Sequence, residues 1–106
     1  MYTLNISLVP SGVAPLDLIA YVRDELAPAV EKDFEGMVRF GRVIDVDGRK
    51  LDDPNESTFS LQLRFQNYAD AVRHEKEKVH PALVATRAHF GSTLLCMSMI
   101  VKTIML

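Results

Sequence analysis

Apolar and polar side chains alternate strictly over residues 58–65, which read T-F-S-L-Q-L-R-F. The apolar side of this stretch consists of Phe59, Leu61, Leu63 and Phe65. A period of two with aromatic and leucine side chains on one side predicts a strand with one apolar and one polar face. Burying each of these four side chains contributes about 1.5–3 kcal/mol, so we expect the strand at the centre of a sheet, over the core.

Three further segments are predicted to be strands. Residues 2–9 alternate in the same way, and the turn-forming residues after them end this strand. Residues 37–47 alternate less cleanly, and Gly41 predicts a bulge within them. Residues 92–106 form the last strand, whose end is apolar on both sides.

The last strand is predicted to present two different sets of side chains. One side carries Leu95, Met97, Met99 and Val101. The other side carries Cys96, Ser98, Ile100 and Lys102. We expect Ser98 and Ile100 to join the polar face of the sheet, away from the helices.

A helical spacing of apolar side chains begins at Pro15, a residue that suits the first turn because its missing N–H has no partner there. Gly36 is expected to close the element. Pro28 lies well inside the pattern and is predicted to kink the helix or to end it near Leu26.

A second helix is predicted to begin after Asn67, a good N-cap residue. Asp70 follows in the first turn, where the helix dipole favours a negative charge. Pro81 is expected to interrupt this helix, and Gly91 is placed as its C-terminal cap.

The element order β-α-β-β-α-β predicts one α+β domain over residues 1–106 with the ferredoxin-like arrangement, a four-stranded antiparallel sheet with both helices on one face. Residues 48–57 are predicted to be a polar hairpin loop. The helix-free face either meets water or meets the same face of a second copy. Because the last strand is apolar on both sides, we expect a homodimer whose two sheets enclose a polar-lined space.

Composition and charge bound the class of protein. The chain has 106 residues, 48% of them hydrophobic, which suits a single core. Its formal net charge of −2 gives no reason to expect a nucleic acid or an anionic membrane as partner. The N-terminus lacks a basic start followed by an apolar run, so we expect no signal peptide and no membrane span. One cysteine fits a reducing compartment, and we expect a cytoplasmic protein.

Candidate ligand-binding residues lie along the predicted polar face. Arg64, beside Gln62 and Asn5, places a guanidinium where it can orient a small anionic or carbonyl ligand between two sheets. Ser60 belongs to the same polar row, and His80 is a further pocket candidate. The alternative for Arg64 is a surface arginine that pairs with a neighbouring carboxylate.

No metal ligand and no catalytic residue is assigned from the sequence. His74, His80 and His89 are six and nine residues apart, whereas helical ligands converge at separations of three or four. Cys96 is interpreted as a packed small hydrophobic residue, because a nucleophile needs a base and an electropositive setting. We therefore expect no cofactor.

Three segments resemble an uncharacterised bacterial family of small ferredoxin-like, dimeric α/β-barrel proteins. They are L-N-I-S-L at residues 4–8, Pro28 within L-A-P-A-V, and H-P-A-L-V-A-T-R-A-H-F-G at residues 80–91. The resemblance implies the fold and the homodimer but no established activity. A histidine is usual in that family two residues before the first-helix proline, and Leu26 stands there in this chain.

Two classes of function are carried forward. The first is a homodimeric small-ligand binding or accessory module, similar to amino-acid-sensing regulatory domains. Those domains often have a glycine in the first strand-to-helix turn, and Gly12 of this chain is compatible with that feature. The alternative is an enzyme, a cofactor-independent oxygenase or haem-handling protein of related barrels. The leucine at position 26 in place of a histidine weighs against the enzyme.

Overall fold

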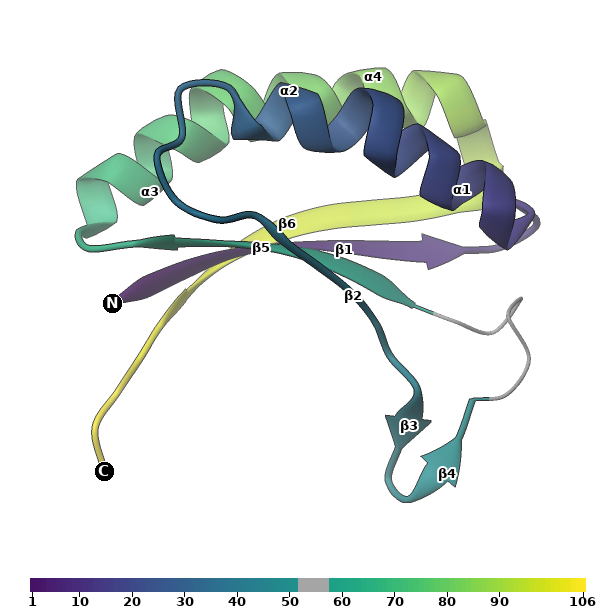
Figure 1. Ribbon diagram of the computed structural model, residues 1–106, viewed down its shortest axis with the longest axis horizontal. Coiled ribbons are helices and arrows are strands. Elements are labelled where there is room, and N and C mark those ends of the chain that lie inside the picture. Colours follow the sequence, from purple (N-terminus) through teal and green to yellow (C-terminus); the bar gives the residue numbers. More distant parts are fainter. Residues whose placement is uncertain (52–57) are drawn as a thin grey trace.

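A four-stranded antiparallel sheet carries the helices on one of its faces (Figure 1). The computed structural model describes residues 1–51 and 58–106. The strand order is β2-β5-β1-β6, so β1 and β5 are central. Its strands are β1 (Tyr2–Pro10), β2 (Arg39–Arg42), β5 (Phe59–Phe65) and β6 (Leu94–Lys102). The predicted mixed α+β fold, with two helices over a four-stranded antiparallel sheet, is confirmed.

Each of the two long helices runs through a π-helical turn. Their segments are α1 (Pro15–Tyr21), η1 (Val22–Leu26) and α2 (Ala27–Glu31), then α3 (Tyr68–His74), η3 (Glu75–Val79) and α4 (His80–Phe90). A 3₁₀ turn, η4 (Gly91–Thr93), leads into β6. Pro28 and Pro81 are each the second residue after a π-helical turn, and the chain stays helical through both of them.

The alternative in which the first helix ends near Leu26 is therefore wrong, and Pro81 does not end the second helix. A proline inside a regular α-helix removes an N–H bond and clashes with the carbonyl four residues earlier. A π-helical turn spaces its hydrogen bonds five residues apart, which relieves that demand. The first helix instead ends at Glu31, five residues before the expected Gly36.

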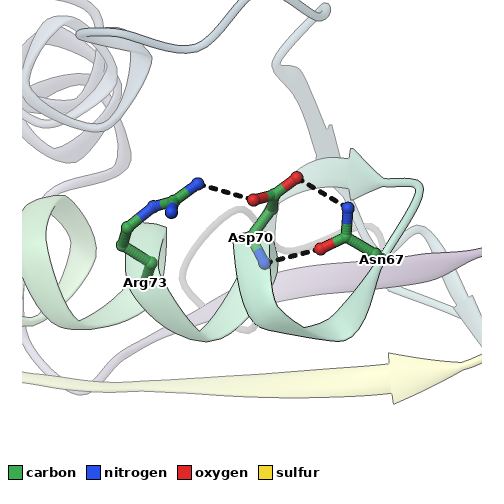
Figure 2. A network of polar contacts seen from close by, with 3 residues as sticks. All are labelled: Asn67, Asp70 and Arg73. Atoms are coloured by element: carbon green, nitrogen blue, oxygen red, sulfur yellow. Dashed lines mark hydrogen bonds and ion pairs between the residues drawn. The ribbon is translucent and has the colours of Figure 1, made fainter.

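Asn67 caps the second helix as predicted. Its backbone is extended, and its side-chain Oδ1 accepts a hydrogen bond from the Asp70 N–H at 2.9 Å. Its Nδ2 donates to the Asp70 carboxylate at 2.8 Å, and Arg73 pairs with the same carboxylate (Figure 2). The cap thus satisfies one of the N–H groups that a helix start leaves without a partner.

We expect Asn67→Ala to lower the free energy of unfolding by about 1 kcal/mol, because the substitution removes the capping acceptor. Urea unfolding followed by circular dichroism measures this change. Asn67→Ser keeps an acceptor at the same position and is expected to recover most of the loss. Equal stabilities for the alanine variant and the unsubstituted protein contradict this role for the cap.

The core lies between the helices and one face of the sheet. Leu4, Ile6 and Leu8 of β1 are completely buried, as are Leu61 and Leu63 of β5. The helices contribute the fully or almost fully buried side chains Leu18, Val22, Leu26, Val30, Val79 and Leu83. The alternation seen in the sequence therefore places the predicted apolar sides of both central strands on the helices.

The register of β6 reverses the predicted faces of that strand. Cys96, Ser98 and Ile100 lie opposite Leu8, Ile6 and Leu4 of β1, on the helix side of the sheet. The Ser98 hydroxyl donates to the Glu75 carboxylate of η3 at 3.2 Å. The predicted placement of Ser98 and Ile100 on the helix-free face is therefore wrong. A strand that is apolar on both sides does not specify its own register, and a slip by one residue exchanges its faces.

The predicted second strand is divided in the structure. Only β2 joins the main sheet, and Gly41 pairs with Ser60 in unbroken register, so the expected bulge is absent. β3 (Asp45–Val46) and β4 (Arg49–Lys50) form a separate hairpin arm, which extends beyond the sheet on the helix-free side (Figure 1). Residues 52–57, within the predicted 48–57 loop, lie outside the described part of the chain.

The turn of the hairpin arm has the backbone that an Asp-Gly pair favours. Asp47 and Gly48 have φ values of 52° and 79°, as both central residues of a tight hairpin turn require. The Gly48 N–H donates to the Asp45 carboxylate at 2.9 Å. This local bond stabilises the turn between β3 and β4.

Candidate functional site

The helix-free face of the sheet changes in character from one edge to the other. Cross-strand pairing places Arg39, Gln62, Asn5 and Met99 in one row over the four strands. The neighbouring row consists of Gly41, Ser60, Ser7 and Met97. On the other side of the first row, Arg64 lies opposite Thr3, and Thr3 lies opposite Val101. The face is thus basic at Arg39 of β2 and Arg64 of β5, uncharged and polar over the rest of β5 and over β1, and apolar on β6.

The structure brings four of the five predicted site residues together. Asn5, Ser60, Gln62 and Arg64 lie on this face because their neighbours in β1 and β5 are the buried core leucines and isoleucine. His80 lies apart from them. It begins α4 in the helix layer, where its side chain is exposed.

A small depression opens on this face beside β2. Its volume is about 120 Å³. Its lining consists of Phe34, Gly36, Met37, Arg39, Gln62 and Arg64. Sequence reasoning missed Arg39 and Phe34 as site residues. The sequence places Arg39 in a predicted strand but does not show that it lies beside Gln62, because this position depends on which strand β2 pairs with.

The loop between α2 and β2 forms one wall of the depression. The Phe34 ring packs against Phe65 and His74, with ring centroids 5.1 and 5.5 Å apart. The Nε2 atom of His74 lies 2.7 Å from the Val30 carbonyl oxygen, a hydrogen bond that fixes the imidazole at the end of α2. A Cβ atom on Gly36 would lie 2.7 Å from the Phe34 ring, so this glycine allows the loop to fold closely over the aromatic side chain.

An ion pair holds the same loop to the second helix. Lys78 Nζ lies 2.9 Å from the Asp33 carboxylate, and this hydrogen bond lowers the pKa of Asp33. Asp33 also has a φ of 62°, a left-handed conformation in which the chain turns away from the helix end. Contacts with α2, α3 and η3 therefore hold the wall of the depression in place.

Asn5, in the middle of the face, has one carboxamide atom without a partner. Its Nδ2 donates to the Ser7 hydroxyl at 3.3 Å. Its Oδ1 is buried and accepts no hydrogen bond from any residue that the structure describes. An unmade hydrogen bond of this kind costs about 1–3 kcal/mol. Because this atom is buried within the single chain, the unmade bond lowers the stability of the fold.

Cys96 belongs to the core and not to this face. Its side chain is almost fully buried, and its backbone carbonyl accepts a hydrogen bond from Arg87 at 3.0 Å. Burial raises the pKa of the Cys96 thiol, which disfavours the reactive thiolate. The structure thus agrees with its interpretation as a packed small residue.

We expect the Cys96 thiol to react with a disulfide reagent at pH 8 at least about tenfold more slowly in the folded protein than in urea, because burial limits both access and ionisation. Absorbance of the released thiolate measures the rate. The sign of the pKa shift predicts that the rate keeps rising above the pH at which an ordinary thiol ionises. Equal rates in folded and unfolded protein contradict the buried placement.

The three histidines do not converge on one site. His74 is buried beneath the loop wall, whereas His89 stacks on Tyr21 at a ring-centroid distance of 4.8 Å. Across residues 1–51 and 58–106, no group of three or more His, Cys, Asp or Glu side chains is arranged to hold a metal ion. Within the same ranges, no helix has the length and apolar character needed to cross a membrane.

A second, wider groove lies on the helix layer between the first helix and α4, with a volume of about 780 Å³. Three carboxylates line it, from Asp17, Asp24 and Glu25. The hydrogen bond from Arg23 lowers the pKa of Asp24, so part of this charge is already paired. The groove shares no lining residue with the depression.

Comparison with known proteins shows the fold. No family model and no curated protein matches the sequence. The crystal structure of an ethyl tert-butyl ether d (ethd) family protein from Bacillus halodurans is similar, with a TM-score of 0.63 and 10% identity over 98% of this chain and 100% of that chain. A structural-genomics target protein from Agrobacterium tumefaciens has a TM-score of 0.63 and 12% identity over 96% of this chain and 92% of that chain. The chain shares their fold.

Proposed function

We propose that the chain is a homodimeric small-ligand binding module of the ferredoxin-like, dimeric α/β-barrel type. Two copies place their helix-free sheet faces toward each other, and the polar rows of β1 and β5 line the space between them. The observation that carries this proposal is the apolar strip on β6 beside those rows. Its side chains Leu95, Met97, Met99 and Val101 are 57%, 41%, 46% and 48% exposed.

A second copy is the occupant that suits this strip. Monomeric proteins rarely expose large contiguous apolar patches, and a two-fold axis lets one patch cover the other. The hairpin arm and the C-terminal end of the chain both extend past the helix-free face (Figure 1). Both carry further exposed apolar side chains, among them Ile44, Val46, Ile104 and Met105. In a dimer these segments are in position to contact the partner.

The polar rows support a ligand rather than a dry interface. Burying a guanidinium or a carboxamide without a hydrogen-bond partner is costly. Arg39, Arg64 and Gln62 therefore require polar groups opposite them once a second copy covers the face. An apolar wall with a few placed polar groups is typical of small-molecule sites. The face offers donors, an acceptor and positive charge, which suits binding.

Sedimentation velocity at micromolar concentration tests the assembly. We expect a dimer of the 106-residue chain. A monomer throughout the micromolar range contradicts the dimer. In parallel, a thermal-shift panel of small acids and carbonyl compounds tests binding, since a ligand that binds only the native state raises the midpoint of unfolding. A panel in which no compound raises the midpoint contradicts the ligand part of the proposal.

A further inference from the structure

We propose that the depression beside β2 binds the carboxylate of an amphipathic organic acid, whose apolar body lies along the helix-free face toward β6. This inference rests on the proposed function and names its class of ligand. It assigns Arg39 to the site together with Arg64 and Gln62, and it selects an acid over an uncharged carbonyl compound.

Two arginines that form no ion pair with any described residue define the part of the site where the carboxylate end of the ligand binds. Arg39 of β2 lies directly opposite Gln62 of β5, and Arg64 is two residues after Gln62 in β5. Arg39 and Arg64 therefore line the same depression. Neither guanidinium makes a hydrogen bond or ion pair with a residue that the structure describes. Arg64 also lines a neighbouring groove, which contains the carboxylates of Asp33, Glu35, Asp70 and Glu77. Asp70 pairs with Arg73 and Asp33 pairs with Lys78, and none of the four forms an ion pair with Arg64.

Like charges placed close together on one sheet face repel, and an anion between them removes that penalty. A carboxylate also matches the planar fork of a guanidinium through two parallel hydrogen bonds. Gln62 adds an amide donor between the two arginines. An uncharged carbonyl group satisfies single donors but leaves both positive charges uncompensated. The ligand end that fits the depression is therefore a carboxylate.

The site for the apolar body of the ligand is inferred from the row of side chains that begins at Arg39. It passes over Gln62 and Asn5 and ends at Met99, with Met97 in the next row. Neighbouring strands are about 4.8 Å apart, so the row spans about 14 Å. Methionine side chains adapt to apolar ligands of different shape. One molecule with a carboxylate at one end and a hydrocarbon body thus meets matching groups at both ends of the row.

Isothermal titration calorimetry with octanoate, acetate and 1-octanol separates the two ends. We expect saturable binding of octanoate at one molecule per chain. Acetate lacks the apolar body and 1-octanol lacks the charge, so each is expected to bind at least about tenfold more weakly. Arg39→Ala and Arg64→Ala are each expected to weaken octanoate binding by at least about tenfold. Arg23→Ala removes the same charge from the helix layer and serves as the matched control, with unchanged affinity.

Equal affinity for 1-octanol and octanoate, unchanged affinity in Arg39→Ala, or no octanoate binding at millimolar concentration overturns the inference. The depression is formed by one chain, so sedimentation of the same samples separates the two proposals. Arginine-dependent octanoate binding by a monomer refutes the dimer and keeps the carboxylate site. A dimer that binds 1-octanol as well as octanoate keeps the assembly and refutes the carboxylate site.

Discussion

Leu63→Ala is expected to lower the free energy of unfolding by about 2–5 kcal/mol, the range found for large-to-small changes in packed cores. Leu63 is completely buried in β5, a central strand, and lies opposite Leu4 of β1. Truncation removes contacts with the second central strand and leaves a cavity that the sheet cannot close by moving one side chain. Urea unfolding measured by circular dichroism, at a fixed protein concentration, gives the change.

The matched control is Leu16→Ala, the same substitution at a position in α1 that is 79% exposed. Its effect is expected to stay within about 0.5 kcal/mol, because surface substitutions away from special contacts change little. If Leu16→Ala costs as much as Leu63→Ala, the helices do not cover the face of the sheet that the structure assigns to the core.

Met99→Glu is expected to convert the proposed dimer into a monomer. Met99 is 46% exposed on the helix-free face, in the middle of the strip that a second copy covers. An unpaired carboxylate buried in an interface costs about 3 kcal/mol or more, which raises the dissociation constant by more than about a hundredfold. Sedimentation velocity measures the state, and circular dichroism checks that the monomer is folded.

Val84→Glu provides the control for this experiment. Val84 is 51% exposed on α4, so the substitution adds the same charge to the helix layer. It is expected to leave the dimer intact, as is Met99→Leu, which keeps an apolar side chain in the strip. Dissociation caused by Val84→Glu but not by Met99→Glu places the interface on the helices and contradicts the proposed assembly.

The sequence predicted correctly the strands that have one apolar and one polar side. The alternation around Leu61 and Leu63 predicted a central strand with its leucines against the helices, and the structure has it so. β6 carries apolar residues on both sides, and its faces are decided only by hydrogen-bond register with β1. That register is a long-range property, and the local sequence carries no signal for it.

The candidate site was predictable to a similar extent. The polar side of β5 placed Gln62 and Arg64 on one face of the sheet, and pairing with β1 added Asn5. Arg39 escaped prediction because β2 is short and does not alternate cleanly. Phe34 comes from a loop whose path depends on contacts with residues far away in the sequence. Such contacts are set by packing, which spacing along the chain does not reveal.

The π-helical turns before Pro28 and Pro81 make both long helices intolerant of a change in length. A π-helical turn holds one residue more than an α-helical turn, so removing one residue from η3 makes this turn a regular α-helical one. In a regular turn the Pro81 ring clashes with the carbonyl four residues before it. Single-residue deletions in functional variants of this chain should therefore spare 22–26 and 75–79 and fall in connecting segments.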